Sequence, residues 1–197
     1  MVGVLASSSA DGGALAAFCI DTTEVTAEDY ATCLKAGVCP PRNESCVEGL
    51  LNDEGRFPAR CMSGDDAAVY CTWKGKRLPS EAEWRRAACG DDGRVYPWGN
   101  EEPTTQLCWM GAPGGFHGTT QRGPCRVGSF PAGRSPSGML DAAGNVDEFV
   151  AKPEGQREHV VRGGSYNESF LTMRCTARLL DSNSNPSRGF RCAASPP

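Results

Sequence analysis

The chain has 197 residues, of which 39% are hydrophobic and 22% charged, a composition typical of one globular domain and not of an intrinsically disordered chain. Its formal net charge is −4, and no run of Lys and Arg interleaved with aromatic residues occurs, which argues against a nucleic-acid partner. No apolar stretch approaches the roughly 20 residues that a membrane-spanning helix requires, so we expect no membrane span.

Residues 1–17 are mostly small, and we predict that they form a flexible N-terminal segment before a domain that occupies residues 18–197. The segment has neither the basic region nor the continuous apolar stretch of a signal peptide. We therefore expect that either a leader has been removed or the domain belongs to a longer chain. A short strand is predicted at the start of the domain, over residues 18–21.

Three helices are predicted from local start and stop signals, over about residues 27–36, 63–75 and 80–90. The third has the plainest signals, because Ser80 at the N-cap and Glu83 three residues later form a capping box.

The remainder of the chain is predicted to contain little regular secondary structure, in keeping with its 24 glycines and 14 prolines. Residues 42–58 and 91–137 are predicted to be irregular loops. In residues 172–179, apolar and polar residues alternate, which predicts a half-buried strand. A second strand with the same alternation is expected around residues 190–194.

Eleven cysteines are too many for an ordinary cytosolic protein without metal. They include no C-x-x-C pair and no neighbouring histidine, so zinc ligation has little support. We therefore predict disulfides and an extracytoplasmic or secreted location. The odd number leaves at least one sulfur unpaired.

Four segments, taken in order, resemble the formylglycine-generating enzyme (sulfatase-modifying factor) family: Cys71–Asn100, Gly138–Phe149, Val160–Tyr166 and Arg188–Ala193. The resemblance covers nearly all of the chain from Phe18 onward. It implies a single, irregular α+β domain related to C-type lectins, low in regular secondary structure and stapled by disulfides.

The resemblance also implies two disulfides, Cys71–Cys192 and Cys89–Cys175. Proximity in sequence alone suggests three more pairs, with Cys19 left over, and these are Cys33–Cys39, Cys46–Cys61 and Cys108–Cys125.

Catalytic members of this family hold Cu(I) between two thiolates, in the stretch between the GGSY and RCxAR motifs. Here that stretch is residues 167–173, which is about three residues shorter than the family's and contains no cysteine. Glu168 falls at the first ligand position and Phe170 near the second. Because Cu(I) requires soft ligands, we expect no copper and no copper-dependent formylglycine synthesis.

Related enzymes that form carbon–sulfur bonds use an iron held by three histidines from a separate domain. The two histidines of this chain, His117 and His159, lack a metal-ligand spacing. We interpret them as ordinary imidazoles of a loop or a strand end.

The family binds calcium with a G-N-x-x-E loop, which this chain retains at residues 144–148. The implied ligands are the Asn145 amide, the Glu148 carboxylate and the backbone carbonyls of Gly144 and Val146, all of them hard oxygens. In the alternative interpretation, Asn145 and Glu148 only cap a turn.

The family's substrate groove corresponds in this chain to Phe149, Ser165, Glu168, Phe170 and Ser187. Ser165 by itself is not a nucleophile, since no His or Asp lies at a motif-defined distance.

Three functions follow as hypotheses. The first is a non-catalytic module whose groove binds a peptide, a protein or a small molecule. The second is an oxidoreductase of altered chemistry, acting on a protein cysteine or a small thiol through Glu168, His159 or a free cysteine. The third is a hypervariable ligand-binding protein on the same lectin-like fold, which is disfavoured because residues 167–185 contain only three asparagines.

Overall fold

The structure is a computed structural model that describes residues 1–8, 14–47, 54–110, 123–181 and 183–196. The helices are α1 (Ala27–Lys35), α2 (Glu44–Val47), α3 (Gly64–Trp73), α4 (Glu81–Cys89) and a 3-10 turn at Pro131–Gly133. The strands are β1 (Val2–Val4), β2 (Ser7–Ser8), β3 (Ala14–Leu15), β4 (Phe18–Ile20), β5 (Asp147–Phe149), β6 (His159–Arg162), β7 (Leu179–Asp181), β8 (Arg188–Phe190) and β9 (Ala193–Ala194).

The three predicted helices are confirmed as α1, α3 and α4. Each begins at a side-chain cap, because the hydroxyls of Thr26, Ser63 and Ser80 accept a hydrogen bond from the backbone N–H three residues later, at 3.1, 3.2 and 3.2 Å. A full capping box is present at Ser63 and at Ser80. The signals that start these helices are therefore local and visible in the sequence.

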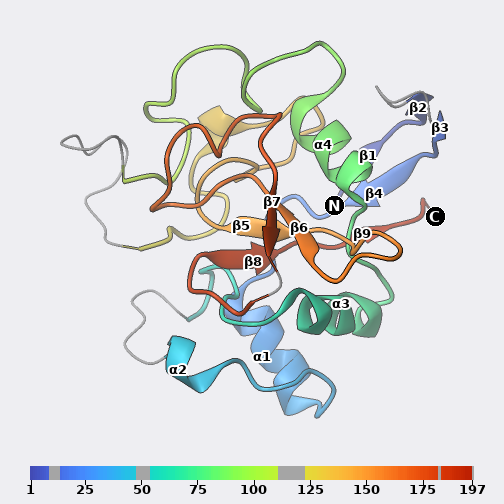
Figure 1. The fold of residues 1–197 in the computed structure, drawn as a ribbon, viewed down its shortest axis with the longest axis vertical. Helices are drawn as coiled ribbons and strands as arrows, with labels where there is room; N and C mark the ends of the chain where they lie inside the picture. Colours follow the sequence, from blue (N-terminus) through green and yellow to red (C-terminus); the bar gives the residue numbers. More distant parts are fainter. Residues whose placement is uncertain (9–13, 48–53, 111–122, 182, 197) are drawn as a thin grey trace.

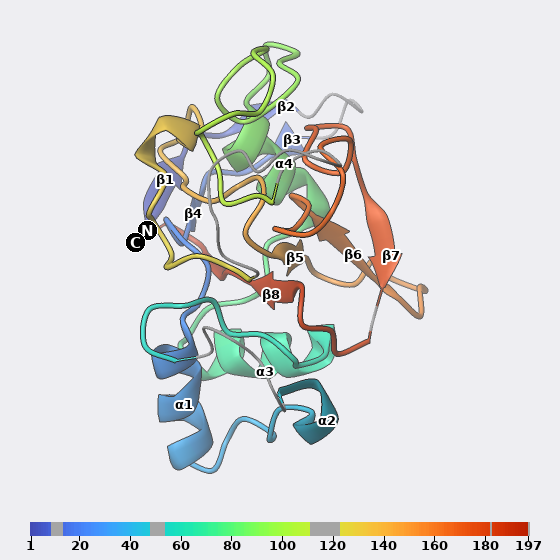
Figure 2. The same ribbon diagram turned by 90° about the vertical axis from the view of Figure 1, so that its left-hand side faces the viewer.

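A four-stranded sheet in the order β7-β6-β5-β8 forms the centre of the molecule. In Figures 1 and 2, α1 and α3 lie on one side of this sheet and α4 on the other. Strand β5 pairs antiparallel with β6 and parallel with β8, which sets Asp147 beside Arg188. A second sheet, β1-β4-β9, joins the two ends of the chain, and β2 pairs with β3. Residues 2–4 of the opening segment thus pair with the predicted strand at Phe18–Ile20.

The core is built from aromatic side chains on both sides of the central sheet. Tyr30 of α1, Tyr70 of α3 and Phe190 of β8 are almost fully buried and pack ring to ring, with 5.8 Å between the tyrosine centroids. On the other side, Trp84 of α4 packs with Val160 and other apolar residues. The strands of the central sheet are only three or four residues long, and these rings fill much of the interior beside them.

Ten of the eleven cysteines form disulfides, and the pairs are those expected from the sequence. They are Cys33–Cys39, Cys46–Cys61, Cys71–Cys192, Cys89–Cys175 and Cys108–Cys125. Cys19 on β4 is the free cysteine. The small, mixed helix-and-strand domain with its long loops confirms the predicted α+β class.

The prediction of a strand over residues 172–179 is wrong. This segment forms successive turns, with hydrogen bonds from Met173 N to Phe170 O and from Ala177 N to Arg174 O, and β7 begins only at its last residue. The alternating pattern arises because Met173 is buried and Cys175 is tied by its disulfide, and no neighbouring strand pairs with the segment.

Within residues 42–58, expected to be irregular, the described part contains the short helix α2. Among the described residues, no helix is both long enough and apolar enough to cross a membrane.

Candidate functional site

The five residues expected to line a ligand groove do not share one surface. Phe149 is fully buried in the core beneath the central sheet, so it does not face a groove. Ser165 and Ser187 are also buried. Glu168 and Phe170 are half-buried and reach the surface.

Ser165 and Ser187 are nevertheless brought together by one side chain that the sequence did not single out. Both hydroxyls donate to Oδ1 of Asn167, at 2.9 and 3.0 Å. Asn167 itself is exposed. Because the Ser165 hydroxyl is engaged with an amide and not with a base, this arrangement orients a surface side chain and does not activate a nucleophile.

Glu168 belongs to an ion-pair cluster centred on Arg188. The guanidinium of Arg188 contacts Asp147, donates through Nη1 to Glu168 Oε1 at 3.3 Å, and through Nε to Asp181 Oδ2 at 3.1 Å. The second carboxylate oxygen of Glu168 is buried without a hydrogen-bond partner. Three acids thus share one guanidinium, and we call these four residues the Arg188 cluster.

The Arg188 cluster shifts the protonation of its most buried acid. Burial raises the pKa of Asp147 to about 8, and the negative charge of Glu168 adds to this shift while Arg188 opposes it. Burial therefore works against ionisation of Asp147, and its direct contact with Arg188 works in favour of it.

The cysteines leave no pair of thiolates for a soft metal. All eleven cysteines lie in the described residues, and ten of them are disulfide-bonded. The remaining thiol, Cys19, lies on β4 in the sheet that joins the chain ends. Apart from the buried thioether of Met173, the stretch between Tyr166 and Arg174 offers only oxygen ligands and a phenyl ring, so it holds no thiolate for Cu(I).

The two side chains expected to bind calcium already have protein partners. Glu148 is fully buried and receives hydrogen bonds from Trp84 Nε1 at 2.8 Å and from two nitrogens of Arg191, each at 2.6 Å. Asn145 accepts from Cys125 N at 2.9 Å and donates to Glu24 Oε1 at 2.9 Å. These hydrogen bonds use part of the acceptor capacity of the two side chains, since each of their oxygens has two lone pairs.

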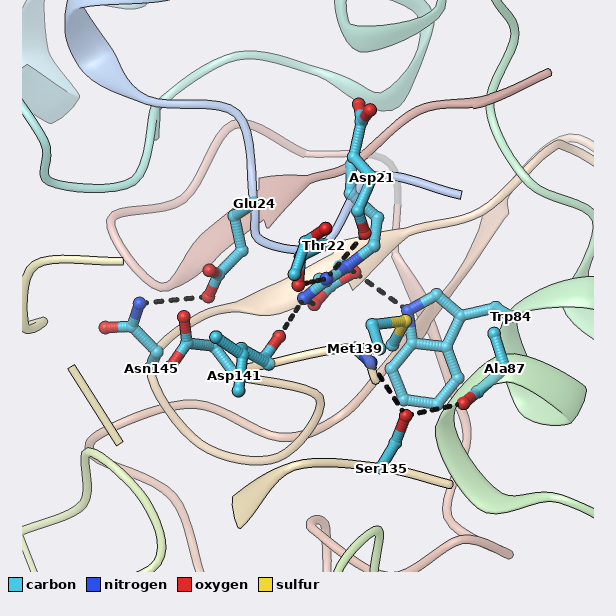
Figure 3. Close-up of polar contacts among 12 residues, drawn as sticks. Asp21, Thr22, Glu24, Trp84, Ala87, Ser135, Met139, Asp141 and Asn145 are labelled. Atoms are coloured by element: carbon cyan, nitrogen blue, oxygen red, sulfur yellow. Dashed lines mark hydrogen bonds and ion pairs between the residues drawn. The ribbon is translucent and has the colours of Figure 1, made fainter. Parts of the chain in front are cut away.

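Two further acids lie beside this loop, and the sequence analysis did not single them out. In Figure 3 the carboxyl groups of Glu24 and Asp141 face each other next to Asn145. Glu24 Oε2 is buried and has no hydrogen-bond partner, whereas Asp141 Oδ2 accepts from Gly128 N at 2.5 Å. Burial raises the pKa of both carboxyls, and their mutual repulsion raises that of Glu24 further.

Among the described residues, no three or more His, Cys, Asp and Glu side chains are grouped so as to hold a metal ion. Hard oxygen donors lie beside this loop, and the unpaired Oε2 of Glu24 fits a cation of the calcium class.

The structure describes one of the two histidines, His159. His159 is buried on β6, with Nδ1 2.8 Å from Val150 O and Nε2 3.0 Å from Asp65 Oδ1. Its two ring nitrogens therefore serve the protein scaffold. His117 lies outside the described residues.

A shallow apolar groove lies elsewhere, on the outer face of α3. Its volume is about 370 Å³, and it is lined by Val38, Asp65, Ala68, Val69, Thr72 and Trp73. None of the residues expected to line a ligand groove contributes to it. It is therefore a second surface on which a ligand could be sought, separate from Asn167 and the Arg188 cluster.

Comparison with known proteins identifies relatives over almost the whole chain. Residues 8–196 match the family described as sulfatase-modifying factor enzyme 1-like domain. A protein of Mus musculus named inactive C-alpha-formylglycine-generating enzyme 2 is 35% identical over 164 residues, which are 74% of this chain and 51% of that protein. The hercynine oxygenase of Mycobacterium tuberculosis is 39% identical over 111 residues, covering 54% of this chain and 24% of that enzyme.

Among solved structures, PvdO from Pseudomonas aeruginosa superimposes with a TM-score of 0.75 at 24% identity, covering 92% of this chain and 81% of that one. This likeness concerns the fold. The chain spans about half the length of the inactive mouse relative, 51%, and less of the oxygenase.

Proposed function

We propose that this chain, which belongs to the family of sulfatase-modifying factor enzyme 1-like domains, is a non-catalytic module that binds a peptide, a protein or a small molecule. The observation that carries the proposal is the absence of two available thiols, since ten of the eleven cysteines are in disulfides. A Cu(I) dithiolate requires two sulfurs that the folded chain does not offer. The mouse relative whose name describes it as inactive supports the same view by analogy.

The ligand surface that we propose contains Asn167 together with the accessible parts of Glu168 and Phe170. Asn167 is exposed and is held in place by two buried hydroxyls. Glu168 is oriented by Arg188, and its backbone carbonyl accepts from Trp109 Nε1 at 2.9 Å. A polar surface whose side chains are fixed in this way suits recognition, because little conformational entropy is lost on binding.

We also propose an extracytoplasmic or secreted location. Disulfides persist in oxidising compartments and are rare in the cytosol. Five of them, two closing loops with sequence separations of 121 and 86 residues, support this assignment. In a native protein without reductant, thiol titration is expected to detect Cys19 alone.

The competing function is an oxidoreductase of altered chemistry, and the similarity to hercynine oxygenase favours it. It would need a redox centre built from residues such as Glu168 or His159. The hydrogen bonds of His159 to Val150 and Asp65 argue against a ligand role for that imidazole.

Two measurements on the oxidised chain separate these functions. Anaerobic Cu(I) titration is expected to give no thiolate-to-copper absorption, and oxygen uptake with a CxPxR-type peptide is expected to stay at background. A catalytic formylglycine-generating enzyme, run in parallel, shows that both assays work. Stoichiometric copper binding with conversion of the peptide cysteine to an aldehyde would refute the non-catalytic proposal.

Peptide-display selection against the chain tests the proposed surface. The selected peptides are expected to lose affinity for Asn167→Ala and to keep it for Val69→Ser, which alters only the groove on α3. The reverse result would move the ligand to α3, and no selectable peptide together with thiol oxidase activity would favour the enzyme.

A further inference from the structure

Three arginines and one glutamate meet between α4, β6 and the start of β7. Arg162 ends β6, Arg178 lies directly before β7, and Glu81 and Arg85 belong to α4. Glu81 Oε1 accepts from Arg178 Nε at 3.0 Å and from Arg162 Nη1 at 3.4 Å. We call these four residues the Arg162 cluster.

Arg85 joins the cluster from the next turn of α4. It follows Glu81 by four residues, a spacing that places two side chains on the same face of a helix. Burial lowers the pKa of Arg162 to about 10; Glu81 opposes this shift, and the positive charges of Arg85 and Arg178 add to it. Arg85 therefore lies close enough for its charge to act on Arg162.

The cluster has a surplus of positive charge. Within it, three guanidinium groups share the single carboxylate of Glu81. The side chain of Arg162 is only 3% exposed, and its buried Nε has no hydrogen-bond partner. Because solvent screens a buried charge poorly, the surplus acts on the surface above it, although the chain as a whole is acidic.

Two of the three guanidinium groups can donate to a ligand in solvent. Arg178 uses only Nε for Glu81 and is 45% exposed, which leaves both of its Nη groups open. Arg85 is exposed and forms no ion pair with any residue that the structure describes. Planar guanidinium groups donate pairs of parallel hydrogen bonds to sulfate, phosphate and carboxylate oxygens. A surplus of two charges favours the doubly charged oxyanions over a single carboxylate.

We infer that Arg85 and Arg178, with the buried charge of Arg162 behind them, bind a tetrahedral oxyanion of the sulfate or phosphate class. The ligand is either the free anion or a sulfate ester carried by an oligosaccharide, and both present the same oxyanion group. No residue of the Arg162 cluster belongs to the surface around Asn167. The site is therefore additional to the proposed binding function and does not depend on it.

The test is titration calorimetry of the oxidised chain at constant ionic strength, balanced with sodium chloride. The probes are inorganic sulfate, inorganic phosphate and a sulfated heparin oligosaccharide. Binding of the inorganic anions assigns the site to the free ion, and binding of the oligosaccharide alone assigns it to a sulfate ester. In either case, Arg85→Gln and Arg178→Gln are each expected to weaken binding by about threefold, and the double variant by the product, about tenfold. Glu81→Gln is expected to tighten binding, because it removes the competing carboxylate.

The matched control replaces two exposed arginines outside the cluster, Arg126 and Arg157, by glutamine. It removes the same two positive charges as the double variant and is expected to leave the affinity unchanged. Arg85→Gln removes no ion pair within the described chain, so its melting temperature is expected to match that of the wild type. Absence of binding for all three probes would overturn the inference. An equal loss in the control and in the double variant would also overturn it, since the attraction would then come from net charge and not from this cluster.

Discussion

Replacing Arg191 by lysine keeps a buried positive charge but changes the group that carries it. Arg191 makes five hydrogen bonds, two of them to Glu148 at 2.6 Å, and both side chains are 0% exposed. A lysine ammonium has three donors and cannot form the paired contact with a carboxylate. At least two hydrogen bonds are therefore lost, and each bond to a charged group contributes about 1.5–3 kcal/mol.

We accordingly expect Arg191→Lys to lower the free energy of unfolding by about 3–6 kcal/mol, the sum for two lost hydrogen bonds to a charged group. The assay is equilibrium unfolding in guanidinium chloride without reductant, followed by tryptophan fluorescence, with the midpoint and the m-value fitted together. A loss below about 1 kcal/mol at an unchanged m-value would mean that the pair behaves like an exposed one, and the reasoning would be refuted.

Arg77→Lys supplies the control for that experiment. Arg77 also forms a two-pronged contact with a carboxylate, Glu83, at 2.6 Å for each bond. Its side chain is 47% exposed, so solvent replaces the lost bonds. The expected loss is below about 1 kcal/mol.

Three further outcomes are expected. Burial raises the pKa of Asp147 from its ordinary value of 3.8 to about 8. The stabilisation of the fold by its protonated form is therefore complete below about pH 3.8. This contribution is lost as pH rises through about 8, so Asp147→Asn should flatten the unfolding free energy across this window in urea titrations. Replacing Cys71 and Cys192 by alanine opens a loop of 121 residues and should cost up to about 4–5 kcal/mol, measured as a lower denaturant midpoint. Gly64→Ala should cost about 1–3 kcal/mol in thermal unfolding, since the added Cβ would lie 2.6 Å from the ring of His159.

Two of these outcomes have a control variant in the same chain. Gly3→Ala should be tolerated, because nothing lies within 4 Å of its added Cβ. Opening Cys33–Cys39, which are 6 residues apart, should cost less than opening the long loop. If Asp147→Asn kept the full pH dependence of the wild type between about pH 4 and 8, its carboxyl would not be the titrating group.

Helices were predictable because their signals lie within a few residues. The Ser80 hydroxyl and the carboxyl of Glu83 satisfy backbone groups three residues away, so the sequence alone specifies the start of α4. The strand predicted over residues 172–179 failed for the opposite reason. Alternating burial there reflects a disulfide and a core contact, and a strand additionally needs a neighbour to pair with.

The charged clusters were not predictable from spacing. Arg188 and Asp147 are 41 residues apart and meet only because β5 and β8 pair in parallel. Asn145 and Glu24 are 121 residues apart. In a single sequence such acids and bases look like ordinary surface residues, and only the fold shows that they are buried together. The disulfide pairs were easier to predict, since the family resemblance limited the possible partners of two pairs and short spacings limited those of the other three.

The sheet β1-β4-β9 also places the first and last strands of the described chain close together. Strands β1 and β9 flank β4, so the two ends are separated by about two inter-strand spacings of 4.8 Å each, and Figures 1 and 2 show them adjacent. A short glycine–serine bridge would span that gap, and new ends opened in an exposed loop would leave the central sheet untouched. The domain is therefore suited to circular permutation, and to insertion into a loop of a host protein.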